Sequence, residues 1–284
     1  MLERFLHGDI GPLVHQPYGH GNLVYVIPDH APPLVVKTSL LPEAFAHTEE
    51  NIRVMASLQI PLPKVVAREQ GETVTILVME HIPGRDLGHS LGEMTLEQRH
   101  VLASQVVEIQ RRVGKLPLGT TYGWAPIGVE AEFPTWTDVV ERDLAKSSGP
   151  YYERLNAFYQ SEKANLATVT AQPFLDDLTV KNVIVENGQL RGIVDVDMIC
   201  YGDPLYWLAL AETTVMLDVG EDGMDYGSQL RRLWISDRKP EKTLALYEGI
   251  FTAHFLSRDL PADVSRRMER FFEARVGPFE NGYF

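Results

Sequence analysis

Asp177-Leu178-Thr179-Val180-Lys181-Asn182 is the stretch of sequence that decides the fold, together with the aspartate Asp195 thirteen residues after Asn182. The segment between them, residues 183–194, holds two short apolar runs separated by Asn187-Gly188. Asn-Gly between apolar runs is the strongest short-range signal for a β-hairpin. A hairpin brings its far end back to its start, so the sequence predicts that Asp177, Asn182 and Asp195 converge.

These three side chains are of the types that phosphoryl transfer requires. That reaction needs a carboxylate to orient the attacking hydroxyl and oxygen ligands that hold Mg²⁺ against the nucleotide phosphates, because positioning and charge neutralisation supply most of the catalysis. On its own, a D-x-x-x-x-N pattern usually marks a turn or a helix cap. The predicted hairpin that follows, with Asp195 at its far end, favours the catalytic interpretation.

Composition sets limits on this interpretation. The chain has 284 residues, 44% of them apolar, so it can bury a large core, and its length favours two lobes. Its single cysteine, Cys200, excludes an intramolecular disulfide. No segment approaches the roughly 20 apolar residues of a membrane helix, and residues 1–9 lack the apolar core of a signal peptide. We therefore expect a cytoplasmic protein with no membrane partner.

The charge of the chain disfavours one class of partner and favours another. Its formal charge is −13, from 26 basic and 39 acidic residues, which argues against nucleic acid because duplex binding depends on Lys and Arg. A cationic small molecule fits this charge better, although many proteins are this acidic for solubility alone. The acids expected to attract such a ligand are Glu130, Glu132, Asp218, Glu221, Asp222 and Asp225.

The first 80 residues are predicted to be rich in strands and the remainder rich in helices. The predicted strands cover residues 23–27, 34–37 and 74–79, and a helix covers residues 42–58. Pro83-Gly84-Arg85 then marks a boundary, and a capping box at Thr95 opens a helix that runs to Val113. Further helices are predicted after Pro134, over residues 151–159, and from Pro204 to the end of the chain.

Asp177, Asn182, Val194-Asp195 and Gly202-Asp203-Pro204 follow one another in a recognisable order. They match the pattern H-G-D-x-x-x-x-N, a hairpin, I-D and G-D-P, and in this the chain resembles the aminoglycoside phosphotransferase and choline kinase family. The resemblance implies an α+β, protein-kinase-like fold with two lobes. It also implies that Asp177 is the catalytic base, that Asn182 and Asp195 bind Mg²⁺, and that Asp203 braces the loop.

The same resemblance extends to the beginning of the chain. Gly19 and Gly21 precede the first strand and resemble the loop that covers the nucleotide, where small residues let backbone N–H groups approach phosphates. Lys37, at the end of an apolar strand, fits the phosphate-binding lysine. Residues 78–84 match the family's hinge, in which Glu80 to Ile82 offer backbone groups to adenine. The implied cofactors are ATP and Mg²⁺.

Three positions depart from the family pattern. Leu175-Asp176 stands where His-Gly is expected before the catalytic aspartate, and Trp207 stands where many relatives have an aspartate. The helix glutamate that pairs with the lysine is expected at Asn51, with Glu50 and Glu49 one and two residues away. We expect Glu50 to pair with the lysine, and Glu49 is the other candidate. The alternative is that both glutamates lie on a solvated helix face.

We therefore predict an α+β chain with a strand-rich small lobe over residues 1–82 and a mostly helical large lobe over residues 83–284. The predicted activity is ATP-dependent transfer of the γ-phosphate to a hydroxyl of a small molecule, with a cationic, aminoglycoside-like compound as the candidate acceptor. The alternative is a nucleotide-binding, pseudokinase-like protein without transferase activity, which Leu175-Asp176 and Asn51 suggest. The two differ in whether an acceptor stimulates release of ADP.

Overall fold

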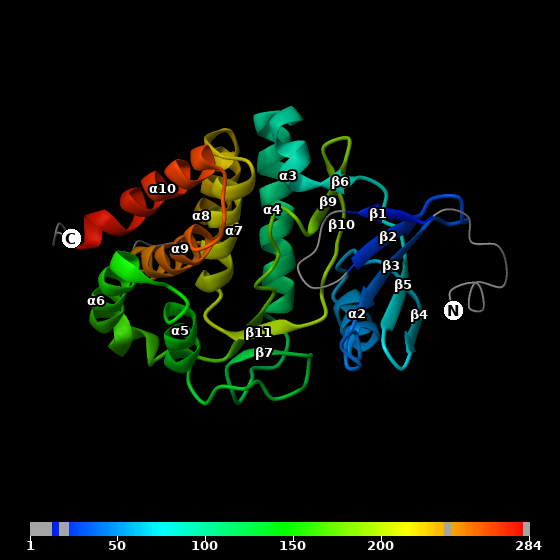
Figure 1. The fold of residues 1–284 in the computed structure, drawn as a ribbon, viewed down its shortest axis with the longest axis horizontal. Coiled ribbons are helices and arrows are strands. Elements are labelled where there is room, and N and C mark those ends of the chain that lie inside the picture. Colours follow the sequence, from blue (N-terminus) through cyan, green and yellow to red (C-terminus); the bar gives the residue numbers. More distant parts are fainter. Residues whose placement is uncertain (1–12, 17–22, 236–239, 281–284) are drawn as a thin grey trace.

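A strand-rich part and a helix-rich part lie side by side in the chain (Figure 1). The computed structural model describes residues 13–16, 23–235 and 240–280. The strand-rich part is a five-stranded antiparallel sheet with the order β1-β2-β3-β5-β4. Its elements are β1 Val14–Gln16, β2 Leu23–Ile27, β3 Leu34–Ser39, α2 Thr48–Ser57, β4 Val65–Gln70 and β5 Thr75–Glu80.

Strand β3 lies in the middle of this sheet, between β2 and β5, and it places Lys37 there. Successive side chains of a strand face opposite sides of the sheet. Val36 accordingly packs with Ile27 and Val78 in one apolar cluster, whereas Lys37 lies on the other face, opposite Leu77. Lys37 is only 8% exposed, so its ammonium group needs a partner within the fold.

The helix-rich part begins with two small sheets that carry the loops of the site. Strands β9 Val183–Glu186 and β10 Gln189–Ile193 form the predicted hairpin, and β6 Arg85–Asp86 pairs with the other edge of β9. Strand β11 Ile199–Gly202 lies between β7 Gly123–Ala125 and β8 Gln172–Phe174. The helices are α3 Leu87–Ser90, α4 Leu96–Val113, α5 Trp136–Leu144, α6 Gly149–Leu166, α7 Leu205–Asp218, α8 Met224–Trp234, α9 Glu241–Leu256 and α10 Ala262–Glu280.

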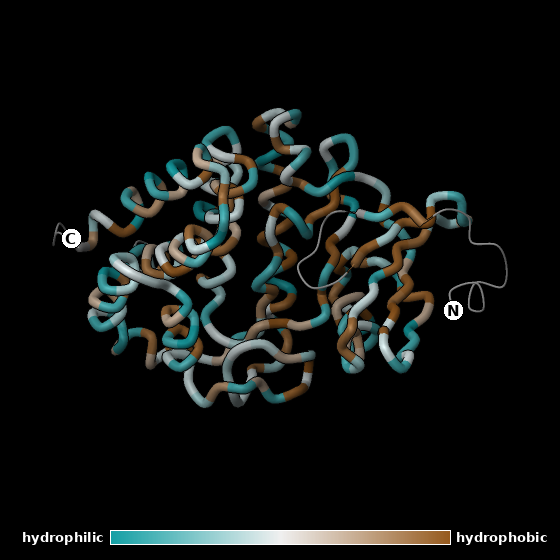
Figure 2. Tube along the Cα trace, viewed as in Figure 1, coloured by the Kyte–Doolittle hydropathy of each residue, from teal (hydrophilic) through white to brown (hydrophobic). Residues whose placement is uncertain are grey.

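Helix α4 stands between the strands and the outer helices (Figure 1). Helices α7 and α9 contact each other and carry buried apolar side chains on several faces, as expected for helices packed on all sides. The ring of Trp136 lies against those of Tyr206 and Tyr247, and all three residues are at most 1% exposed. Hydrophobic residues follow the strands of the sheet, whereas α6 and α10 contain many hydrophilic residues (Figure 2).

Most predicted elements appear close to their expected bounds. The predicted strands are β2, β3 and β5, and the capping box at Thr95 opens α4. The helix predicted over residues 42–58 begins only at Thr48, since the backbone at Phe45 has a positive φ of 60° that a helix cannot contain. No helix in the described ranges combines the length and hydropathy needed to cross a bilayer.

The boundary between the lobes at residue 82 stays a prediction. Pairing of the strands supports it, because β5 belongs to the five-stranded sheet and β6 pairs with β9 of the helix-rich part. Between them, Gly84 has φ +129°, and a Cβ there would come within 2.4 Å of the carbonyl oxygen of Val185. Only glycine allows this sharp passage from one part to the other.

Candidate active site

The loop between β8 and β9, residues 175–182, carries Asp177 and Asn182, and neutral hydrogen bonds hold it in place. The carboxamide of Gln110 clamps Leu175 by accepting from its N–H at 3.0 Å and donating to its carbonyl oxygen. Asn182 Nδ2 donates to the carbonyl oxygen of Asp177 at 2.8 Å. Gln110, on α4, is 1% exposed, and the sequence reasoning missed it. Its only signal was a glutamine on an otherwise apolar helix face.

Helix α7 contacts the same loop through Trp207. Trp207, which is fully buried, donates from Nε1 to the carbonyl oxygen of Leu178 at 2.9 Å. Asp203 caps the start of α7 by accepting from the N–H of Leu205 at 3.0 Å, and it accepts from the Tyr247 hydroxyl at 3.0 Å. Trp207 therefore braces the loop from a position where an aspartate was expected.

Asp177 is exposed, and it lines a small pocket together with Asp176 and Asp195. Loss of water around it, followed by the negative charges of Asp176 and Asp195, raises its pKa to about 7. Weaker opposing effects come from Asn182 and from the Thr179 hydroxyl, 3.3 Å from Oδ1. Asp177 is thus a carboxyl group that both accepts and releases a proton near neutral pH.

Asp176 has a different environment. Its Oδ2 accepts from Trp124 Nε1 at 2.5 Å, and burial raises its pKa above the ordinary range of an aspartate. The guanidinium of Arg142 stacks over the Trp124 ring, 4.1 Å from the ring centre. Since its carboxyl group is already engaged with an indole, Asp176 is the less suitable of the two aspartates to receive a proton from a bound hydroxyl. Trp124 is a further residue that the sequence reasoning missed.

Lys37 and Asp195 meet across the two parts of the fold. Lys37 Nζ lies 2.7 Å from Asp195 Oδ1, and the Asp195 side chain is 46% exposed. Asp195 follows the hairpin with φ +64°, a region that residues other than glycine enter rarely and at a cost. Lys37, Asp177 and Asp195 thus gather at one place, since Asp195 also acts on the Asp177 carboxyl and lines the same small pocket.

The prediction that Glu50 pairs with Lys37 is wrong. Glu50 lies on the outer face of α2, where its carboxylate accepts from Arg53 Nε at 2.8 Å and from Nη2 at 2.5 Å. Lys37 pairs with Asp195 instead. The residue that faces inward is Asn51, which is fully buried. Residues three apart lie on one face of a helix, so Glu50 and Arg53 share the solvated side.

Glu80 and Ile82 are predicted to contact the nucleotide. The Glu80 N–H is taken by the carbonyl oxygen of Lys64 at 2.8 Å, and its carboxylate lies 3.3 Å from Lys64 Nζ. In the described part of the chain, the Ile82 N–H has no hydrogen-bond partner, as a group that contacts adenine requires. Gly19 and Gly21 fall outside the described residues. The contacts of Glu80 and Ile82 with a nucleotide stay predictions.

With this geometry in place, the chain can be compared with known proteins. The sequence profile of the Phosphotransferase enzyme family (APH) matches residues 17–230. The chain belongs to this family. No curated protein matches it by sequence.

Solved structures of phosphotransferases share its fold. A thermostable mutant of aminoglycoside phosphotransferase APH(4)-Ia, in ternary complex with ADP and hygromycin B, is 17% identical with a TM-score of 0.71, over 99% of this chain and 96% of that one. APH(3'')-Id from Streptomyces rimosus is 15% identical with a TM-score of 0.63, over 89% and 96%. Together with the family match, these likenesses confirm the predicted α+β, protein-kinase-like fold.

Phosphotransferases of this fold class use Mg²⁺ with their nucleotide, and the donor set here fits that ion. Mg²⁺ prefers one or two protein oxygen ligands completed by phosphates and water. The Asn182 amide nitrogen is turned to the Asp177 carbonyl, which leaves the amide oxygen on its other side, and the Asp195 carboxylate is half exposed. Within the described ranges, no cluster of three or more His, Cys, Asp or Glu side chains offers a competing metal site.

The acids predicted to attract a cationic acceptor are mostly occupied. Asp218 lies 3.4 Å from Lys181, Glu221 lies 3.1 Å from Arg270, and Asp225 lies 2.5 Å from Arg99. Glu130 accepts from the Thr120 hydroxyl at 3.2 Å. The charges of Asp218, Glu221 and Asp225 are therefore largely neutralised by lysine and arginine partners. The spacing of residues in the sequence did not reveal these partners.

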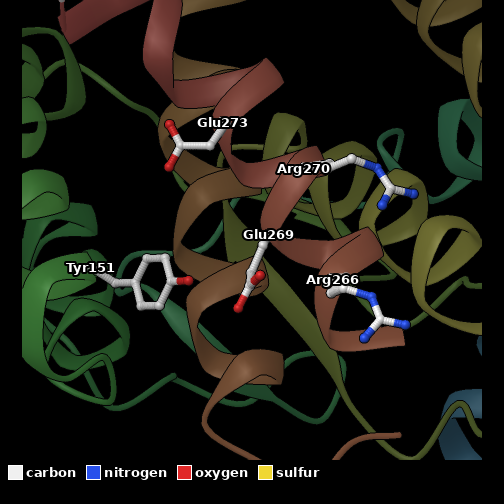
Figure 3. Close-up of a pocket in the computed structure, with 5 residues that line it drawn as sticks. All are labelled: Tyr151, Arg266, Glu269, Arg270 and Glu273. Atoms are coloured by element: carbon white, nitrogen blue, oxygen red, sulfur yellow. The ribbon is translucent and has the colours of Figure 1, made fainter. Parts of the chain in front are cut away.

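A larger hollow lies between α6 and α10 (Figure 3). Tyr151 on α6 faces Glu269 and Glu273 on α10, and the guanidinium groups of Arg266 and Arg270 lie along the same helix (Figure 3). No residue of the 175–182 loop lines this hollow. It is open to solvent and is not part of the candidate active site.

Proposed function

We propose that the protein is an ATP-dependent kinase that phosphorylates a hydroxyl group of a small molecule. The observation that carries the proposal is that Asp177 and Asp195 line one small pocket, with Lys37 paired to Asp195 and Asn182 fixed to the Asp177 backbone. Family membership and the shared fold support it. Similar structures that hold ADP or AMP-PNP support ATP as the phosphate donor.

In this proposal each residue has a defined part. The ammonium of Lys37 leaves Asp195 and binds phosphate oxygens. Asp195 and Asn182 would hold Mg²⁺, which would neutralise phosphate charge. Asp177 accepts a hydrogen bond from the acceptor hydroxyl and takes its proton. The hydroxyl oxygen forms a bond to the γ-phosphorus as the bond to the β–γ bridging oxygen breaks, and ADP leaves. A pKa of about 7 suits Asp177 to this proton transfer.

The acceptor that we propose to test first is an aminoglycoside-like, cationic compound. Similar structures of APH(4)-Ia hold hygromycin B, and the net charge of −13 favours a cation. Attraction between exposed charges is screened by salt over about 10 Å at 0.1 M. The KM of such an acceptor should therefore rise with ionic strength more than the KM of ATP. A neutral acceptor used equally well at all salt concentrations would exclude the cationic class.

Release of ADP in the presence of Mg²⁺ tests the proposal across a panel of amines and uncharged alcohols. Stimulation by at least one acceptor, lost in Asp177→Asn, is the expected result.

The second candidate function, nucleotide binding without transfer, is favoured by the direct pairing of Lys37 with Asp195 in place of a helix glutamate. Mg-ATP binding by calorimetry without acceptor-stimulated ADP release would establish it.

A further inference from the structure

The side chain of Asn51, a residue of the small lobe, makes its hydrogen bonds with the helix-rich part. Asn51 lies on α2 and is fully buried. Its Nδ2 donates to the carbonyl oxygens of Val196 and Asp197, at 3.2 Å and 2.6 Å, and its Oδ1 accepts from the Ile127 N–H at 2.9 Å. All three partners belong to the helix-rich part. One carboxamide therefore joins α2 to two separate loops of the other lobe.

A second residue of α2 reinforces the same contact. Thr48, one helical turn earlier and 2% exposed, donates its hydroxyl to the carboxylate of Asp197. Residues three apart lie on one face of a helix, so Thr48 and Asn51 form a continuous contact with the segment that follows Asp195. Because of this contact, the two residues directly after Asp195 are tied down by their backbone and side-chain groups.

The backbone of Asp195 needs such support. Its φ of +64° is unfavourable for a residue with a side chain, and such conformations persist only where surrounding contacts fix them. Val196 and Asp197 are the residues through which contacts can hold it from the C-terminal side. A carboxamide suits the position because it offers donors and an acceptor together, whereas a carboxylate would face two carbonyl oxygens with no proton to give.

We propose that Asn51 is a positioning residue, a neutral clip between the lobes that holds Asp195 in the conformation in which it binds Mg²⁺. The part of this proposal that concerns Mg²⁺ rests on the proposed kinase function. The clip replaces an ion pair between α2 and Lys37, which leaves the lysine to pair with Asp195 itself until a nucleotide binds.

Hydrogen exchange of the nucleotide-free protein tests the clip without any assumption about activity. Asn51→Ala should increase amide exchange about tenfold or more in residues 194–199 and at Ile127, because these amides lose a local restraint. Two controls keep wild-type exchange there. Ser57→Ala changes an exposed residue of the same helix, and Leu246→Ala destabilises the buried face of α9. Unchanged exchange in Asn51→Ala, or an equal increase in Leu246→Ala, overturns the clip.

Calorimetry of ATP binding at varied Mg²⁺ tests the positioning role. Loss of a group that orients a metal ligand typically costs 10- to 100-fold in metal affinity or activity, so Asn51→Ala should raise the half-saturating Mg²⁺ concentration by about tenfold or more. ATP binding without Mg²⁺ should change little. Wild-type Mg²⁺ dependence in Asn51→Ala, together with the increased exchange in residues 194–199, would overturn this role. If the wild-type protein binds no Mg-ATP, the proposed function fails while the exchange experiment still decides the clip.

Asn51→Asp gives a signature that loss of stability alone does not produce. A protonated carboxyl can again donate to one carbonyl, and burial beside two carbonyl oxygens raises the pKa of an aspartate. Affinity for Mg-ATP, relative to the wild type at each pH, should therefore rise as the pH falls from 8 to 5. A ratio that is constant over this range overturns the proposal. If neither variant folds, Thr48→Val, which replaces the hydroxyl by a methyl, must show the increased exchange and the raised half-saturating Mg²⁺ concentration at smaller size.

Discussion

Asp177 should titrate near neutral pH in the nucleotide-free protein. The pKa of its carboxyl is raised to about 7, whereas an ordinary aspartate titrates at about 3.9. About one tenth of the Asp177 carboxyls are then ionised at pH 6, and about nine tenths at pH 8. Carbon-13 NMR of the aspartate carboxyl groups measures this directly, and the resonance that disappears in Asp177→Asn assigns it.

Two substitutions separate the causes of this shift. Asp176→Asn and Asp195→Asn each remove a negative charge beside Asp177, so each should lower its pKa. Loss of water around the carboxyl is the largest cause, so the pKa should stay above that of a free aspartate in both variants. Titration of Asp177 near 4 in the wild type, or a pKa that neither substitution changes, would refute the reasoning.

The raised pKa also has a consequence for stability. Since the folded state holds this proton more tightly than the unfolded chain, the proton stabilises the fold fully below about pH 4, and this contribution is lost as the pH rises through about 7. The asparagine in Asp177→Asn cannot ionise, so this variant places no negative charge there as the pH rises. Its melting temperature should exceed that of the wild type at pH 8, and the difference should shrink as the pH approaches 4. A difference independent of pH would contradict this linkage.

Four substitutions test the roles of the site residues further. Asp177→Asn should lower turnover by about 10²- to 10⁴-fold with Mg-ATP binding retained, as for a lost general base, and Asp176→Asn should retain most activity in the same steady-state assay. At 100 times its Kd, Mg-ATP stabilises the fold by about 2.7 kcal/mol. Lys37→Met should remove about 1.4 kcal/mol of this for each tenfold loss of affinity, measured by thermal shift. Trp207→Phe leaves the Leu178 carbonyl unpaired, so denaturant unfolding should show a loss of about 1–3 kcal/mol.

The parts of the site that local sequence determines could be predicted. The Asn187-Gly188 turn sets the β9–β10 hairpin, whose two ends place Asn182 and Asp195 close together; both residues at the turn have positive φ, 53° and 75°. The alternation of strand β3 likewise places Lys37 on the opposite face from Val36. These features depend on residues near each other in the chain, so their patterns are visible in the sequence.

Partners far apart in the sequence could not be predicted. The contacts of Asn51 lie 76 to 146 residues away, and those of Gln110 with Leu175 lie 65 residues away. The apolar spacing of α2 placed Asn51 on the inner face, but preference for an ion pair favoured Glu50. The amide is satisfied in the interior because two loops of the other lobe present backbone groups to it, and sequence patterns do not contain that information.

The three side chains that fix the loops of the site share a chemical property. Gln110, Trp207 and Asn51 are buried and uncharged, and each binds backbone carbonyl oxygens. The proposed reaction requires Lys37 and Asp195 to separate and then to pair again after ADP leaves. If the loops depended on that ion pair, each exchange of partners would loosen them. Neutral hydrogen bonds keep their strength while the charges around them change, so the loops can hold one geometry through the whole cycle.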